Sequence, residues 1–135
     1  MTEVRLFVAD APSGDWSELT DGDQRAVRVA ASDLQQARRA RARIRARGED
    51  VAVILDVTVA VAGDFRSARR VLGPTDHTVH YAGTVDGLAG LISDIARADV
   101  ADGVTLISAS PRQNPRDLGR DVLRRLASRD QPKAS

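Results

Sequence analysis

Four charged or hydroxyl-bearing side chains fall in phase along the apolar segments of this sequence. In residues 51–61 (VAVILDVTVAV) the odd positions are bulky and aliphatic, whereas the even positions include Asp56 and Thr58. Arg5 and Arg28 interrupt two other short apolar runs at alternate positions. Since alternate residues of a strand point to opposite faces, these side chains are predicted to share one face of a sheet. That face cannot be sealed by apolar packing, because an unpaired buried charge costs several kcal/mol.

The charged face is open to two interpretations. An arginine that is free of Asp56 could hold an anion through two parallel hydrogen bonds. Alternatively, Asp56 is simply held by one of the two arginines, Arg5 or Arg28, or by the hydroxyl of Thr58. We favour the second interpretation, because charges in the middle of small sheets are usually paired.

The turn-rich segment at residues 10–15 (DAPSGD) is a second candidate site. Ser13 and Gly14 offer a hydroxyl group and unobstructed backbone N–H groups, which suit a phosphate at the carboxyl edge of a parallel sheet. Pro-Ser-Gly is also a common turn sequence, and an ordinary turn is the favoured interpretation.

Two further clusters are given simpler interpretations. His77 and His80 lie beside Tyr81 and could exchange protons near neutral pH, but only Asp76 is near enough in sequence to be a third ligand, so no metal site is expected. Six arginines are concentrated within ten residues, without an aromatic residue between them, so we expect a solvated helix face and no nucleic-acid partner. They are Arg38, Arg39, Arg41, Arg43, Arg45 and Arg47.

Periodicity along the chain indicates the elements that must position these residues. Short apolar runs predict four strands, at residues 4–9, 26–31, 51–61 and 103–108, of which 51–61 is expected to be central. Helical spacing predicts four helices: from an N-cap at Ser32 to Gly48, around 65–72, from an N-cap at Thr84 onward, and around 118–126. Residues 75–80 are expected to be irregular or a short extended segment.

This alternation predicts an α/β fold with four mostly parallel strands alternating with helices, the helices packing chiefly on one face. The other face would be a wet concavity, a ligand site or a subunit contact. We expect one domain over residues 1–128 and a polar C-terminal tail at 129–135.

Composition excludes several classes of function. The chain has 135 residues and a formal net charge of +1, which leaves no overall field to attract nucleic acid or an anionic membrane. It has no cysteine, which rules out disulfides, thiolate catalysis and cysteine-based metal sites. The sequence shows neither an export signal nor a stretch of about 18 apolar residues, so we expect a cytoplasmic protein without a membrane partner.

Several segments, in order, resemble the C-terminal half of the bacterial luciferase-like flavin-dependent monooxygenases, nearest the nitrilotriacetate and alkanesulfonate monooxygenase branch. Residues 81–92 (YAGTVDGLAGLI) are similar to the Gly-Thr-Pro-Glu helix start of that family, and ADGVTL at 101–106 to its closing strand. Residues 7–14, 26–34 and 51–63 resemble three preceding strands and their turns. Val85, Asp86, Gly87 and Val104 depart from the family pattern.

The resemblance implies half of a TIM (β/α)₈ barrel, since a whole barrel needs about 250 residues. It places Ser13 and Gly14 in a phosphate-contacting loop and makes Arg28 and Asp56 further cofactor-binding candidates for FMN or a deazaflavin. A homodimer, or a complex with a chain supplying the other half-barrel, is expected to complete the flavin pocket. The alternative is a non-catalytic binding or assembly domain that keeps the half-barrel scaffold. No catalytic residue is assigned.

Overall fold

The sheet is built around one long strand, β4 (Ala52–Val61). The computed structural model describes residues 4–9, 16–48, 50–62, 79–109 and 113–130. On one edge β4 pairs with β6 (Gly103–Ser108), and on the other it pairs first with β3 (Ala26–Val29) and then with β5 (Val79–Gly83), all in parallel. The prediction that this apolar run forms the central strand is confirmed.

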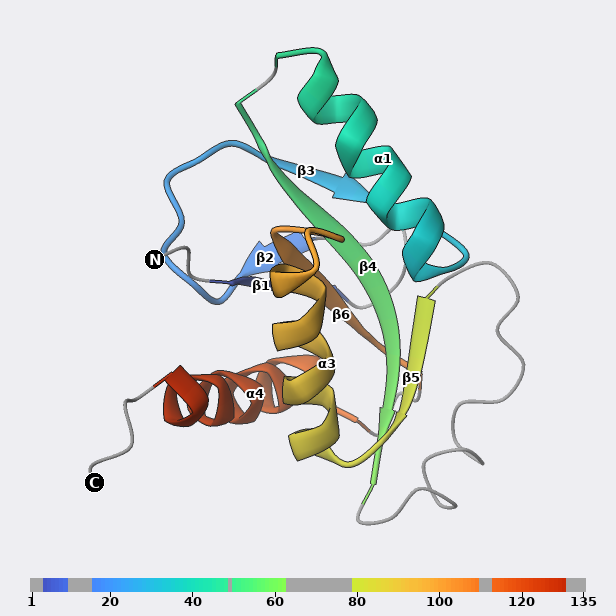
Figure 1. The fold of residues 1–135 in the computed structure, drawn as a ribbon. Helices are drawn as coiled ribbons and strands as arrows, with labels where there is room; N and C mark the ends of the chain where they lie inside the picture. The colour runs from blue at the N-terminus through green and yellow to red at the C-terminus, as the bar shows by residue number, and fades with distance from the viewer. Residues whose placement is uncertain (1–3, 10–15, 49, 63–78, 110–112, 131–135) are drawn as a thin grey trace, which may run out of the picture.

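Two N-terminal strands extend the sheet beyond β6. β1 (Arg5–Ala9) runs parallel to β6, and the short β2 (Trp16–Glu18) runs antiparallel to β1. The strand order is β2-β1-β6-β4-β3, with β5 beside the second half of β4. The strands twist strongly across one another, so the mixed sheet curls into a half-barrel (Figure 1).

Three helices are described, and each begins at a residue that satisfies its free backbone N–H groups. Asp33 accepts a hydrogen bond from the N–H of Gln36 at the start of α1 (Leu34–Ala46), and Thr84 accepts one from Gly87 at the start of α3 (Val85–Arg97). Asn114 does the same for α4 (Pro115–Asp130), which has proline in its first turn. Thr84 was predicted correctly. The prediction of Ser32 as a cap was wrong by one residue, because the Ser32 hydroxyl instead donates to the side chain of Gln36.

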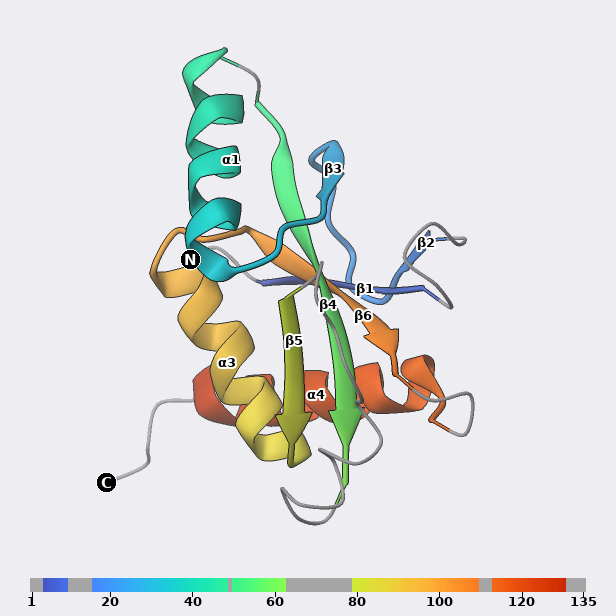
Figure 2. The ribbon, with the colours of Figure 1, turned by 90° about the vertical axis from the view of Figure 1, so that its right-hand side faces the viewer.

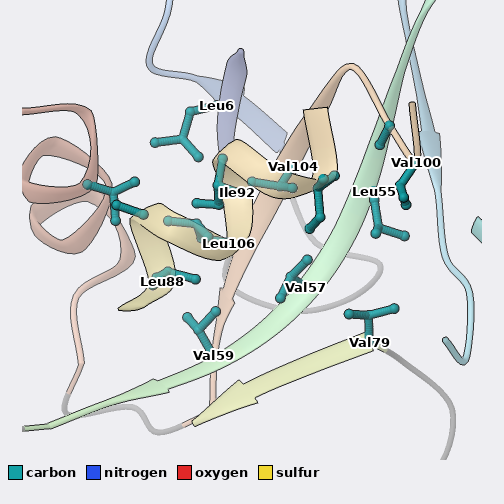
Figure 3. Packing of buried hydrophobic residues seen from close by; sticks show 14 of the residues in the cluster. Leu6, Leu55, Val57, Val59, Val79, Leu88, Ile92, Val100, Val104 and Leu106 are labelled. Atoms are coloured by element: carbon teal, nitrogen blue, oxygen red, sulfur yellow. The ribbon is translucent and has the colours of Figure 1, made fainter. Parts of the chain in front are cut away.

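All three helices lie on the same side of the sheet (Figure 2). The core forms where α3 and α4 meet the outward-facing aliphatic side chains of β1, β4 and β6 (Figure 3). Buried residues at its centre include Leu6, Leu55, Val57, Leu88, Ile92, Val104 and Leu106. The described helices therefore cover only one face of the sheet. The opposite face, which carries no helix among the described residues, is called the inner face below.

The predicted fold is confirmed at the level of an α/β half-barrel. All four predicted strands are present and parallel to one another, but β2 and β5 add to them, and β2 makes the sheet mixed. The predicted helix around 65–72 lies outside the described residues. The last helix runs to Asp130, so the first two residues of the expected tail belong to α4.

None of the helices in the described ranges has the length and apolar character needed to cross a membrane.

Candidate functional site

The inner face carries the charged and hydroxyl side chains that the strand alternation predicted. β3 contributes Arg28, and β4 contributes Asp56 and Thr58. In the pairing register Asp56 lies beside Thr105 of β6, and Thr58 lies beside His80 of β5. One face of four neighbouring strands, β3, β4, β5 and β6, therefore gathers a cation, a carboxylate, two hydroxyls and an imidazole.

An ion pair lies at the centre of this group. The Nε of Arg28 donates to Oδ1 of Asp56 over 2.7 Å. Thr105, which is fully buried, is a second hydrogen-bond partner of Asp56. Asp56 is only 2% exposed, whereas the Arg28 side chain keeps 19% of its surface accessible. Only the arginine of this pair is therefore positioned to reach a ligand, and Asp56 serves to hold it.

Asp56 is also electrostatically perturbed. Burial raises the pKa of its carboxyl above the usual value, and the hydrogen bond and positive charge of Arg28 only partly offset that rise. Perturbed carboxyls concentrate at functional sites, although structural ion pairs perturb the pKa as well. Arg28 therefore favours the ionised form of Asp56, against the burial that disfavours it.

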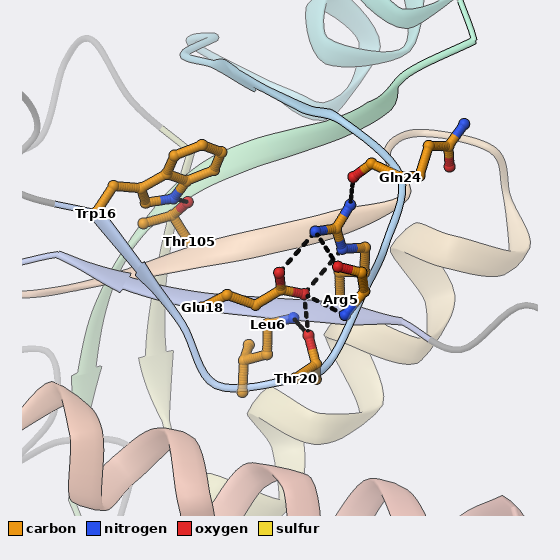
Figure 4. Close-up of polar contacts among 8 residues, drawn as sticks. Arg5, Leu6, Trp16, Glu18, Thr20, Gln24 and Thr105 are labelled. Carbon is orange, nitrogen blue, oxygen red and sulfur yellow. Dashed lines mark hydrogen bonds and ion pairs between the residues drawn. The ribbon is translucent and has the colours of Figure 1, made fainter.

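Two aromatic rings cover the part of the inner face next to this pair. The ring of Trp16 in β2 stacks on Phe7 of β1, with centroids 4.1 Å apart and an interplanar angle of 17°. The indole Nε1 donates to the hydroxyl of Thr105 over 2.8 Å (Figure 4). Thr105 thus links the aromatic stack to the Asp56–Arg28 pair.

The second inner-face arginine is held separately, at the opposite end of β1 (Figure 4). Nε and Nη2 of Arg5 donate to the two carboxylate oxygens of Glu18, at 2.8 and 2.6 Å, and Nη1 donates to the backbone oxygen of Gln24. The hydrogen bond from Arg5 lowers the pKa of Glu18, and the same bond raises the pKa of Arg5. This bidentate pair fastens β1 and β2 to the segment that leads into β3.

These contacts decide which predicted residues come together. Arg28 pairs with Asp56, in agreement with the interpretation that one of the two arginines holds this carboxylate. Arg5 does not reach Asp56, because β6 separates β1 from β4. The hydroxyl of Thr105, which was not predicted, also forms a hydrogen bond with Asp56. His80 is exposed and lies on β5, in the segment that was expected to be irregular or extended. Ser13, Gly14 and His77 lie outside the described residues.

Sequence reasoning missed Trp16, Glu18 and Thr105. The signal for Thr105 was available, since it alternates with Val104 and Leu106 as Asp56 alternates with Leu55 and Val57. Trp16 and Glu18 lie in a three-residue strand, which is too short for a periodic pattern, and their contacts depend on β2 folding back along β1.

The arginine-rich helix is anchored at one carboxylate near the amino ends of the parallel strands. Arg41 donates to Oδ1 of Asp102 at 3.0 Å through Nη2, and Arg45 donates to Oδ2 at 3.2 Å. Asp102 also accepts from the backbone N–H of Val53. The expected solvated face is therefore correct for Arg38, Arg39, Arg43 and Arg47, which are exposed, but not for these two. Asp102 connects α1, β4 and the start of β6.

The charge of Asp102 is expected to contribute about 2 kcal/mol to the free energy of unfolding at neutral pH. This is less than a fully buried ion pair contributes, because the Asp102 side chain is partly exposed. Burial alone would raise its pKa, but the bonds from Arg41 and Val53 outweigh it and leave the pKa lowered. A carboxylate whose pKa is lowered in the fold contributes its full stabilisation above the unfolded pKa of about 3.9. That stabilisation is lost as the pH falls through the folded pKa. Asp102→Asn, which keeps an acceptor for Val53, should therefore lose stability at pH 7, and the difference from wild type should be smaller at pH 3 in urea titrations.

The exposed Asp94 in α3 provides the matched control, since Asp94→Asn removes the same charge without touching an arginine of α1. A constant difference between Asp102→Asn and wild type at both pH values would contradict the proposed role of the charge.

The described residues contain no group of three histidine, aspartate or glutamate side chains arranged to hold a metal ion. No protein-family model matches the chain, and the search of curated proteins finds no significant match.

Proposed function

We propose that this chain is a flavin-binding half-barrel of the luciferase-like oxidoreductase type, whose pocket is completed when a second copy or a partner chain covers the inner face. The single observation that carries the proposal is the asymmetry of the sheet. Helices cover the outer face, while the inner face presents a partly accessible arginine held in place by a buried carboxylate. Together with the order of the luciferase-like segments, this asymmetry favours a TIM-type half-barrel over an ordinary open sheet.

The inner-face residues fit an anionic, aromatic cofactor in part. Arg28 supplies one accessible cation, suited to a phosphate or to an electron-rich edge of the ring system, and Asp56 fixes its orientation. FMN or a deazaflavin would supply the redox chemistry, while the protein would orient it and exclude water. The proposed phosphate contacts at Ser13 and Gly14 are a sequence expectation that complements Arg28.

Assembly is part of the proposal because the half-barrel leaves strand edges available. Within the described residues, β2 pairs only with β1, and β3 pairs only with β4. An unpaired strand edge and a charged inner face are both features that a second chain can cover. A homodimer is the simplest assembly, since the same surface then serves both partners.

The alternative, a non-catalytic binding or assembly domain, is favoured by a different observation. Asp56 and Arg28 already satisfy one another, which is what a purely structural ion pair would do. In that case the chain would self-associate or bind a partner without taking up flavin.

Flavin titration separates the two candidates. We expect FMN or a deazaflavin to bind saturably, with quenching of flavin fluorescence and a rise in melting temperature through preferential binding to the folded state. Arg28→Gln should weaken binding about tenfold, the equivalent of one lost charge-assisted contact of about 1.4 kcal/mol. Arg38→Gln, an exposed arginine of α1, serves as the control and should leave binding unchanged.

Light scattering on the same samples tests assembly. Flavin binding that accompanies a dimer supports the proposal, and a dimer that takes up neither flavin supports the assembly domain. A protein that stays monomeric and binds no flavin contradicts both.

A further inference from the structure

A cavity lies at the amino ends of the parallel strands. Its volume is about 210 Å³, and it is bounded by the starts of β1 and β4, the loop before β6, and one side of α1. Its charged lining consists of Arg5, Arg41, Arg45, Asp99 and Asp102. The remaining lining is mostly alanine, so charged groups dominate its chemistry.

The three arginines of this cavity are paired unequally with carboxylates. Arg5 is neutralised by its two bonds to Glu18. Arg41 and Arg45, however, share the single carboxylate of Asp102, so one of the two guanidinium charges has no carboxylate of its own. Asp99 is the other carboxylate of the lining, but among the described ion pairs it joins neither arginine, so Arg41 and Arg45 depend on one carboxylate at contact distance.

Arg45 also has a donor without an acceptor. Its Nε is buried, yet it has no hydrogen-bond partner. A buried N–H group of a charged side chain that is left unsatisfied costs about 1–3 kcal/mol, so such groups are expected to have a partner in the working state of a protein. Because this Nε has almost no accessible surface, an anion oxygen becomes its partner only when the Arg45 side chain, which is 35% exposed, turns toward the cavity.

From the two arginines that share one carboxylate and from the unsatisfied donor we infer that this cavity binds a small tetrahedral oxyanion, of the inorganic phosphate or sulfate class, against Arg45 and Arg41. The volume supports a small ion, because pockets for drug-sized ligands and cofactors enclose about 300–1,000 Å³. Neither Arg28 nor Asp56 lines this cavity, so the site is separate from the proposed flavin contacts, and it requires neither flavin nor a second chain.

Asp99 gives the inference a directional test. It also lines the cavity, its residue is exposed, and its carboxylate opposes an anion there. Asp99 has a φ of 58°, in the left-handed region, which asparagine adopts as readily as aspartate. Asp99→Asn thus removes the opposing charge without straining the backbone.

The experiment measures binding of inorganic phosphate, and separately of sulfate, to the full chain without flavin. Chloride at equal ionic strength is the reference. We expect saturable broadening of the phosphate ³¹P resonance and a concentration-dependent rise in melting temperature. Arg45→Gln should weaken binding at least about tenfold, whereas Arg38→Gln on the same helix should not change it. Asp99→Asn should strengthen binding about threefold.

Three results would overturn the inference. The first is phosphate or sulfate stabilising the chain no more than chloride does. The second is Arg45→Gln and Arg38→Gln weakening binding equally, which would indicate general attraction to the basic helix. The third is Asp99→Asn leaving the affinity unchanged. Circular dichroism confirms that each variant is folded, and Arg41 should keep α1 attached to Asp102 in Arg45→Gln.

Discussion

Asp56→Ala is expected to lower the free energy of unfolding by about 3 kcal/mol, the loss typical of removing one partner from a buried ion pair. The substitution leaves Arg28 facing the inner side of the sheet without its carboxylate, and it deprives the fully buried Thr105 of a hydrogen-bond partner. Urea denaturation, with an unchanged slope, measures the effect.

The control is the double variant Asp56→Ala/Arg28→Met, which removes both charges. Because an ion pair replaced by apolar groups is often neutral in stability, the double variant should recover much of the loss. If the two substitutions are instead additive, the pair contributes no coupling energy, and Asp56 does not hold Arg28 in the way proposed.

Asp56 and Asp102 are expected to respond to pH in opposite directions. Burial raises the pKa of Asp56, so its contribution to stability is fully present below the unfolded pKa and declines as the pH rises through the folded value. Asp102, whose pKa is lowered by Arg41 and Val53, contributes most above that range. The difference has a physical cause: Asp102 accepts hydrogen bonds from two arginines and a backbone N–H, whereas Asp56 is more deeply buried and has one arginine.

The strands and helices could be predicted from the sequence because their patterns are long and local. Ten consecutive buried or nearly buried residues make β4 unmistakable, and the apolar stripe of α3 has a regular helical period. β5 was not predicted as a strand, because His80 and Tyr81 interrupt its apolar character and only an irregular or short extended segment was expected at residues 75–80. β2 could not be predicted, since its three residues form a strand only by pairing with β1.

The strand order and the partners of the charged residues depend on contacts between distant parts of the chain. Alternation correctly placed Arg28 and Asp56 on one face, but it cannot tell which strands are neighbours. β1 pairs with β6, about a hundred residues away, so Arg5 lies too far across the sheet for Asp56 and binds Glu18 instead. The alternation of residue types thus determined which face is charged, and the topology determined which charges meet.

Gly103→Ala is expected to destabilise the fold by about 3 kcal/mol, at the upper end of the usual range for overpacking. Gly103 is the first residue of β6 and pairs with Arg5 in β1. A Cβ at this position would overlap the backbone carbonyl of Arg5, and a backbone atom in the middle of a paired sheet cannot move aside as a side chain can. The strain would fall on the junction that also carries Asp102 and the Arg5–Glu18 pair.

Gly119→Ala is the matched control, because its Cβ would also make a close contact, but with the end of the flexible Leu19 side chain. Gly119 lies inside α4, where alanine favours the helix by about 1 kcal/mol and offsets the cost of moving Leu19. Thermal and urea unfolding should therefore show a large loss for Gly103→Ala and little change for Gly119→Ala. Equal losses would mean that β1 and β6 can separate without cost, and the pairing that closes this side of the half-barrel would then be wrong.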